Sequence, residues 1–473
     1  MIIGRENEQR LLEELFESDE SEFVAVYGRR RVGKTYLIRE TFNYRFSFYH
    51  TGIQGGNKKQ QLTEFAQSLR TAGMKKVGRL KDWFAAFHAL EDFLATLPEG
   101  RKVVFIDELP WLDTQKSGFV SALGYFWNSW ATMRKDILLV VCGSATSWII
   151  SKIVMNRGGL HNRLTRQIYV PPFTLYECEL YVRSRGFVMT RLQILELYMV
   201  LGGIPFYWTF LQKQLSATQN IDYLFFADNA PLRDEFDALY ASLFKNSRIH
   251  IQTVRALGTK KAGMARGEII DNMGIETGGT ISQVLKELEQ CGFVRVYNSI
   301  GKSAKDTIYQ LIDNFTLFYF KFIDENRSHN REFWSQSVGK PAHSVWCGLA
   351  FERVCLQHSR QIRRALGISG ILCGIYSWVY RPKNSDETGV QIDMLIDRDD
   401  NVINLCEIKF SQGEYEITKQ YDAAIRHKIS VFESKTNTRK AVWPVMITTF
   451  GLQRNCYAND ILHQVVLNDL FVE

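Results

Sequence analysis

The chain has 473 residues, 45% hydrophobic and 23% charged, which is ordinary globular material long enough for about three domains. Its eight scattered cysteines form no Cys-x-x-Cys pair, so neither a disulfide framework nor a zinc site is indicated. The net charge of +7 permits a nucleic-acid partner without requiring one. Because the start, MIIGRENEQR, has no apolar signal region and the longest apolar stretch is interrupted by Gly and hydroxyl residues, we expect a cytoplasmic protein without a membrane span.

The strongest motif lies in residues 23–38. An apolar strand at 23–27 runs into an octet that matches G-x-x-x-x-G-K-[ST], formed by Gly28, Arg29, Arg30, Arg31, Val32, Gly33, Lys34 and Thr35, and a helix follows. Backbone N–H groups and a helix N-terminus arranged in this way surround a phosphate, while the lysine reaches the terminal phosphates and the threonine ligates magnesium. A mere glycine turn would not need a strand and a helix on either side. The sequence therefore predicts ATP and Mg²⁺ as cofactors.

Two further strands end in polar residues. Residues 101–112 place an apolar run before Asp107 and Glu108, which predicts that Asp107 supports the magnesium and that Glu108 orients the attacking water. A third buried strand ends at Ser144, whose hydroxyl can report the γ-phosphate or can simply cap the strand end. This acid pair favours hydrolysis over binding alone.

In chain order, Gly4-Arg5-Glu6, the phosphate loop, Asp107-Glu108, residues 143–146, GGLHNRLTRQIYVPPF and GGIPFYW resemble the AAA+-like archaeal and bacterial ATPases of the STAND-related group. The resemblance implies that Pro205, in a helical lid, contacts the nucleotide. It also implies that Arg163 senses phosphate within or between subunits, so an oligomer is possible. Arg157 and Arg166 are alternatives for that arginine.

The chain then turns helical. Residues 176–246 show apolar positions every three or four residues and predict the lid, after a P-loop core at 1–175. Residues 247–312 predict three short helices and a hairpin, which is the pattern of a winged helix, with Lys302 and Lys305 at the wing tip. Since the third helix is not notably basic, a protein-binding or spacer role is an open alternative to DNA binding.

A polar stretch within 313–339 predicts a linker before a last domain at 340–473. That domain starts with a helix over 344–367 that carries Glu352, followed by a hairpin of two strands with Asp393 on the first and Glu407 and Lys409 on the second. One interpretation is an edge hairpin with solvent-facing charges. In this order, however, the residues resemble the PD-(D/E)xK nuclease superfamily, in the form appended to such ATPases and often called DUF234.

Together these patterns predict the fold class α/β, with a P-loop NTPase domain, a helical lid and a winged helix. The resemblance adds a C-terminal restriction-endonuclease-like α/β domain and implies its chemistry. Glu352, Asp393 and Glu407 would hold Mg²⁺ or Mn²⁺, and Lys409 would activate water. Two functions stay open: an ATPase coupled to a metal-dependent nuclease that acts on nucleic acid, or an ATP-controlled switch whose C-terminal fold only binds a partner.

Overall fold

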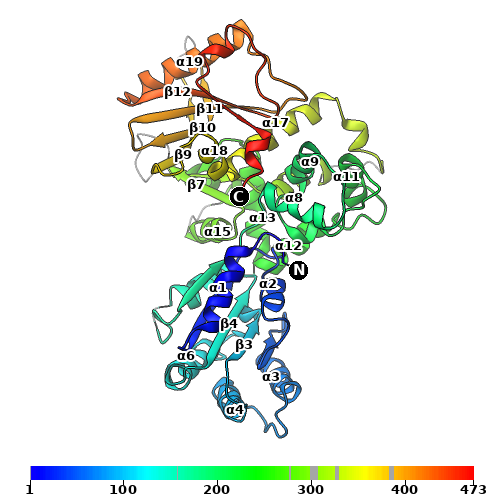
Figure 1. The fold of residues 1–473 in the computed structure, drawn as a ribbon, viewed down its shortest axis with the longest axis vertical. Coiled ribbons are helices and arrows are strands. Elements are labelled where there is room, and N and C mark those ends of the chain that lie inside the picture. The colour runs from blue at the N-terminus through cyan, green and yellow to red at the C-terminus, as the bar shows by residue number, and fades with distance from the viewer. Residues whose placement is uncertain are drawn as a thin grey trace. The chain divides into compact units, whose positions relative to one another are not determined.

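The computed structural model describes residues 2–156, 158–244, 246–275, 279–298, 307–324, 330–382 and 388–473. The chain divides into two compact units, Met1–Pro172 and Phe173–Glu473, which we call the N-terminal and the C-terminal unit (Figure 1). The wing-tip residues Lys302 and Lys305 and the alternative arginine Arg157 lie outside the described residues.

The N-terminal unit is built on a parallel five-stranded sheet with the order β2-β3-β4-β1-β5. Its strands are β1 (Glu22–Tyr27), β2 (Phe48–Thr51), β3 (Lys102–Asp107), β4 (Ile137–Gly143) and β5 (Arg166–Tyr169). Strands β3 and β4 are buried along their whole length, as expected for a parallel sheet that is covered on both faces. Because all five strands run in one direction, the loops that follow β1 and β3 come out at the same edge.

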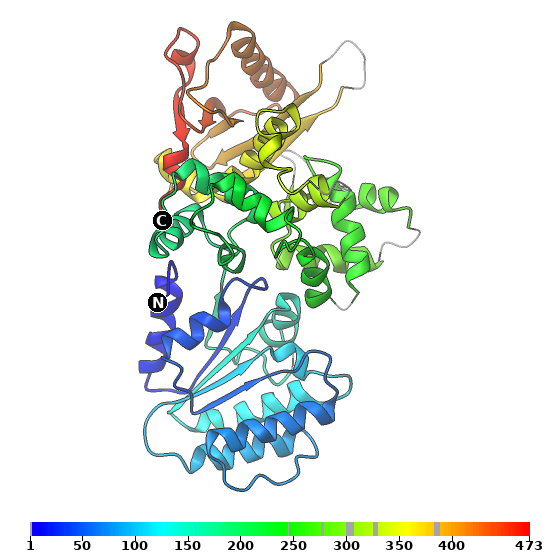
Figure 2. The ribbon, with the colours of Figure 1, turned by 90° about the vertical axis from the view of Figure 1, so that its right-hand side faces the viewer.

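Helices cover both faces of this sheet. They are α1 (Glu6–Glu17), α2 (Lys34–Thr41), α3 (Lys58–Ala72), α4 (Trp83–Ala95), α5 (Leu109–Leu112), α6 (Phe119–Ser129) and α7 (Thr146–Ile149). Figure 2 shows α1 and α2 on the opposite side of the sheet from α3, α4 and α6. An aromatic-rich core joins the sheet to α3, α4 and α6 and includes Phe65, Trp83, Phe87, Phe119 and Phe126.

The C-terminal unit begins with helices and a small sheet. The helices up to the small sheet are α8 (Leu175–Ser184), α9 (Arg191–Leu201), α10 (Pro205–Trp208), α11 (Ala217–Phe225), α12 (Glu235–Leu243), α13 (Ser247–Gly258), α14 (Arg266–Met273) and α15 (Gly279–Gln290). The strands β6 (Met264–Ala265), β7 (Val294–Asn298) and β8 (Thr307–Leu311) form an antiparallel sheet with β8 in the middle. We call residues 247–311 the helix–hairpin segment. The described residues thus contain the three helices and the hairpin strands that the sequence predicted there.

A second five-stranded sheet, with the order β13-β12-β11-β10-β9, forms the rest of this unit. Its strands are β9 (Cys373–Tyr380), β10 (Val390–Arg398), β11 (Val402–Lys409), β12 (Ala441–Thr448) and β13 (His463–Val466), and its helices are α17 (Pro341–Gln357), α18 (Ser359–Ala365) and α19 (Lys419–Thr436). The hairpin β10–β11 lies between β9 and β12, not at an edge. The interpretation of its acids as edge charges is therefore wrong.

One expectation is modified by packing. The segment 313–339, predicted as a linker, includes the short helix α16 (Asn314–Phe318), and its side chains Phe318 and Trp334 are buried. The backbone N–H of Trp334 also donates to the Asp222 carboxylate over 2.7 Å, so the segment is packed into the unit.

Within the described part of the chain, we find no helix with the length and apolar character that a membrane crossing requires.

Candidate functional site

The phosphate loop joins β1 to α2 in the N-terminal unit. Gly28 has φ +148°, and a Cβ there would lie 2.3 Å from the Val170 carbonyl oxygen, so this position accepts only glycine. Gly33, at φ +92°, and Arg31, at φ +70°, are also left-handed, while Arg29 and Val32 are buried. Such turns direct successive N–H groups to one side of the loop. The sequence motif therefore forms the loop conformation that it predicts.

Lys34 starts α2 and is 5% exposed. Its ammonium donates to the carbonyl oxygens of Gly28 and Arg29 over 2.8 and 2.9 Å. These contacts hold the charge above the loop, next to the helix N-terminus, where a phosphate would be attracted by both.

The next residue connects the loop to β3. Thr35 Oγ1 donates to Asp107 Oδ2 over 2.9 Å, and Asp107 Oδ1 accepts from the Glu108 backbone N–H over 2.9 Å. Glu108 has a left-handed backbone, with φ 48° and ψ 47°, which is uncommon for a residue other than glycine. Its carboxylate accepts from Ser144, over 2.6 Å from the hydroxyl and 3.2 Å from the backbone N–H. Ser144 therefore positions Glu108 rather than acting as a plain strand cap.

The oxygen pair of Thr35 and Asp107 is suited to magnesium. Mg²⁺ is commonly bound by one or two protein oxygens together with water and substrate phosphates, and these two oxygens lie beside the predicted phosphate position. The residues present thus fit the magnesium that the motif implies.

Two predicted nucleotide contacts stay predictions. Arg163 is exposed, and Pro205 begins α10 in the C-terminal unit, whereas the phosphate loop belongs to the N-terminal unit. The neighbouring Gly203 has a packing reason of its own, because a Cβ there would lie 1.8 Å from the Phe173 carbonyl oxygen. The carbonyl of Gly203 also accepts from the Phe173 N–H over 2.6 Å.

In the C-terminal unit, Glu352 and Asp393 both form ion pairs with Lys261, a residue that the sequence did not suggest. The Lys261 ammonium lies 2.5 Å from Glu352 Oε2 and 2.9 Å from Asp393 Oδ1, and the two acids are 14% and 15% exposed. Glu352 comes from α17, which packs on β11, and Asp393 comes from β10. Lys261 lies between α13 and β6 in the helix–hairpin segment.

A β-bulge aims the Asp393 side chain. The pairing of β10 with β9 shifts between Ile392 and Leu395, so β10 has one extra residue at this point. Bulges next to sites often redirect a side chain in this way. The Asp393 carbonyl accepts from Ser377 Oγ over 2.7 Å, and its carboxylate accepts from Gln391 over 3.0 Å.

Glu407 has different partners. Tyr421 Oη donates to Glu407 Oε2 over 2.8 Å and Lys428 Nζ to Oε1 over 2.6 Å, both from α19. Lys409 lies with its ammonium 5.0 Å from the centre of the Tyr421 ring. The side chain of Glu407 is 3% exposed, so both of its oxygens are bound in a buried position.

Electrostatics agree with these pairings. Burial and the neighbouring Asp393 raise the pKa of Glu352 above its ordinary value, and Lys261 counteracts them in part. Burial lowers the pKa of Lys261, but Asp393 and Glu352 raise it by more, so the amine stays charged. Burial and the proximity of Glu407 raise the pKa of Tyr421, which keeps its hydroxyl as a donor.

The predicted metal residues are thus brought to one region, but they do not form a metal site in this arrangement. Among the described residues, we find no group of three or more His, Cys, Asp or Glu side chains that could hold a metal ion. Lys261 lies between Glu352 and Asp393, and Glu407 is occupied by Tyr421 and Lys428. The donor set as it stands does not fit the ion that the resemblance implies.

Sequence reasoning missed two lysines of this cluster. Lys428 lies seven residues after Tyr421 on α19, a spacing that puts both on one helix face and could have revealed it. Lys261 has no such signal, because its partners lie on α17 and β10 and only the fold brings them together.

The residues around the phosphate loop are similar to part of a known protein family. Residues 2–207 match a family described as an ATPase domain predominantly from Archaea. This part of the chain is similar to the ATPase domains of that family. An uncharacterized protein of Methanocaldococcus jannaschii is 24% identical over 398 residues, which cover 82% of this chain and 83% of that protein.

Two solved structures show partial likeness. The Walker-type ATPase PABY2304 of Pyrococcus abyssi has a TM-score of 0.48 at 17% identity and covers 68% of this chain and 96% of its own. The ORC2 protein of Aeropyrum pernix has a TM-score of 0.42 at 14% identity, with 76% and 96% covered.

Proposed function

We propose that the N-terminal unit binds ATP with Mg²⁺ and hydrolyses it. The observation that carries the proposal is the 2.9 Å hydrogen bond between Thr35 and Asp107, which brings the end of the phosphate loop to the end of β3. In doubly wound sheets, ligands bind at this carboxyl edge of the strands. The match of residues 2–207 to an ATPase domain supports the same conclusion.

Each side chain has a distinct role in this proposal. The N–H groups of the loop and Lys34 bind the β- and γ-phosphates. Thr35 and Asp107 would hold Mg²⁺, which would supply positive charge beside the phosphates. Glu108, fixed by Ser144, orients the attacking water and accepts its proton. Pro205 and Arg163 would complete the site from the lid and from the same or a neighbouring subunit.

The test separates binding from turnover. Glu108→Gln should keep nucleotide affinity but lower phosphate release by about 10²–10⁴-fold, because only the proton acceptor is lost. Lys34→Ala should weaken binding itself, as measured by titration with a fluorescent ATP analogue. Lys59→Ala, an exposed lysine on α3, is the matched control and should change neither quantity. Undiminished turnover in Glu108→Gln would remove that residue from the mechanism.

We propose, as a second candidate function, that the C-terminal unit acts on nucleic acid at Glu352 and Asp393. The observation in its favour is that two acids from separate elements meet at a bulge within the sheet, beside a cavity of about 430 Å³ that Lys261, Glu352 and Asp393 help to line. The net charge of +7 suits a phosphodiester partner. The alternative is a switch in which ATP controls a C-terminal fold that only binds a partner, and the ion pairs on Lys261 favour it in this arrangement.

Digestion of several DNA and RNA substrates, with Mg²⁺ or Mn²⁺ and with or without ATP, distinguishes these two functions. Asp393→Ala should abolish cleavage and leave ATP hydrolysis nearly intact, because Asp393 and the phosphate loop belong to separate units. Loss of both activities would indicate a folding role for Asp393. We also propose a cytoplasmic location, since the scattered cysteines without a Cys-x-x-Cys pair favour a reducing compartment, and an oligomeric state.

A further inference from the structure

The C-terminal carboxylate pair already has a cation, and it comes from another part of the chain. We propose that Lys261 occupies the position between Glu352 and Asp393 that a divalent cation would take, so that the site binds such an ion only when Lys261 is displaced. The inference rests on the second candidate function, since it concerns the same two acids.

The geometry supports a single shared cation. One nitrogen, Lys261 Nζ, contacts Glu352 at 2.5 Å and Asp393 at 2.9 Å. Both acids are largely buried, and two buried carboxylates in proximity need a positive charge between them. An ammonium supplies one charge where a divalent ion would supply two, and both would approach the same oxygens. Lysine and metal are therefore alternatives at this position.

The lysine is held by the helix–hairpin segment rather than by the elements that carry the acids. Its backbone carbonyl accepts from Gln310 Nε2 on β8 over 2.9 Å. In the same segment, Arg295 Nη2 on β7 donates to the Ile375 carbonyl on β9 over 2.7 Å. The segment is thus attached to the sheet next to Asp393, and Lys261 projects from it towards the acids.

Displacement of the side chain needs no rearrangement of the core. Lys261 is 36% exposed, and the cavity of about 430 Å³ adjoins it. Rotation about the side-chain bonds of Lys261 would move the ammonium away from the acids once its two ion pairs break. The acids, in contrast, are fixed by a helix and by a central strand.

Manganese binding to the full-length chain without nucleotide tests the inference, with free Mn²⁺ measured by electron paramagnetic resonance. Lys261→Met should bind Mn²⁺ at least about tenfold more tightly than the wild type, because the competing cation is gone. Mn²⁺ should also raise the melting temperature of this variant and leave that of the wild type nearly unchanged. Ions bound in the N-terminal unit cancel in the comparison, since all variants share it.

Two controls keep the result specific. Lys260→Met removes the preceding lysine, which pairs with Glu268 and not with the two acids, and it should bind Mn²⁺ like the wild type. The gain in Mn²⁺ affinity should disappear in the double variant Lys261→Met/Asp393→Asn. If Lys261→Met does not fold, Lys261→Gln keeps polar contacts to both acids and replaces it in the same measurement.

The outcomes separate this inference from the nuclease proposal. Tighter Mn²⁺ binding without any cleavage supports the inference and removes the second candidate function. Metal-dependent cleavage by the wild type, with no gain in Mn²⁺ affinity on replacement of Lys261, overturns the inference and leaves that function standing. A gain in Mn²⁺ affinity that persists in Lys261→Met/Asp393→Asn also overturns the inference.

Discussion

At the scale of single residues, the contact between Ser144 and Glu108 decides how the candidate ATPase site is organised. A glutamate that orients water must be fixed, and here both carboxylate oxygens accept from one serine at the end of β4. The left-handed backbone of Glu108 turns its side chain towards this serine. Ser144 therefore fixes the position of the Glu108 carboxylate, which is the proposed proton acceptor.

Ser144→Ala is predicted to slow hydrolysis while ATP affinity stays unchanged. Without the hydroxyl, Glu108 keeps only the longer contact to the backbone N–H, and a misplaced catalytic group costs about 10–100-fold in rate. Single-turnover phosphate release at saturating ATP measures this effect. Ser144→Thr should restore much of the rate, and Ser129→Ala, an exposed serine on α6, should have no effect. A weakened ATP affinity with an unchanged rate would contradict the assignment.

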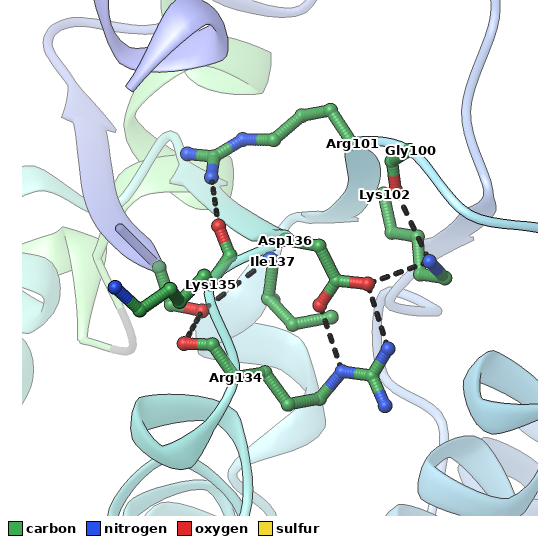
Figure 3. A network of polar contacts seen from close by, with 8 residues as sticks. Gly100, Arg101, Lys102, Arg134, Lys135, Asp136 and Ile137 are labelled. Carbon is green, nitrogen blue, oxygen red and sulfur yellow. Dashed lines mark hydrogen bonds and ion pairs between the residues drawn. The ribbon is translucent and has the colours of Figure 1, made fainter. Parts of the chain in front are cut away.

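At the scale of elements, a polar network joins the N-terminal ends of β3 and β4 (Figure 3). The phosphate loop lies at the opposite, C-terminal end of the strands. Asp136 accepts from Arg134 over 2.6 and 2.8 Å and from Lys102 over 2.6 Å. Hydrogen bonds from Arg134 and Lys102 hold the pKa of Asp136 well below its ordinary value, against the effect of burial. Lys102 is 3% exposed, so Asp136 is the counter-charge of a buried ammonium.

Asp136→Asn is predicted to destabilise the N-terminal unit by on the order of 2 kcal/mol, because a buried ammonium loses its counter-charge. Chemical denaturation of the full chain measures the change in the free energy of unfolding. Lys135→Ala is the neighbouring control, since this lysine is 76% exposed and contacts an exposed glutamate, and it should change stability by less than about 0.5 kcal/mol. Equal effects of the two substitutions would show that the network does not stabilise the sheet.

The elements also show where sequence patterns suffice and where they fail. The first strand and the hairpin were predictable, because apolar runs and a turn at residues 399–401 define them locally, and Asn401 has the left-handed φ that such a turn needs. The helix predicted over 344–367 is interrupted at His358. There the ring Nε2 accepts from the Leu175 N–H over 3.0 Å, a contact with a distant segment that no local pattern reveals.

At the scale of the whole molecule, the two candidate sites differ in the same way: one is defined by local sequence motifs and the other by contacts between distant segments. The residues of the phosphate loop and of the ends of β3 and β4 could be predicted to lie together, because they follow strand ends in fixed motifs. The nucleotide contacts of Arg163 and Pro205 stay predictions. In the C-terminal cluster, the acidic residues could be predicted from the sequence, but Lys261 could not. Lys261 belongs to a different segment, and its ion pairs depend on how that segment packs on the sheet. The sequence therefore predicted a metal where the fold places a lysine.

Each unit also contains a buried histidine that is kept neutral. Burial lowers the pKa of His50 on β2 to about 4 and that of His358 to about 4. His358 donates from Nδ1 to the Val354 carbonyl over 2.8 Å while its other nitrogen accepts, an arrangement that only the neutral ring can make. Protonation of either ring would leave a charge in an apolar environment.

Mild acid is therefore predicted to destabilise both units. Above pH 6.5 each histidine is neutral in the folded and unfolded chain and contributes no pH dependence; between pH 6.5 and about 4 the unfolded chain binds a proton that the folded chain does not. Stability should fall in this window by roughly 1.4 kcal/mol per pH unit for each histidine, and the slope should vanish below it. Urea denaturation at several pH values measures the slope, which His358→Gln should reduce for the C-terminal unit and His50→Gln for the N-terminal unit. His427→Gln, an exposed position on α19, should leave it unchanged. If the slope of the C-terminal unit were the same in His358→Gln as in the wild type, the acid sensitivity of that unit would come from other groups, such as His343, whose pKa is also lowered by burial, or its carboxylates.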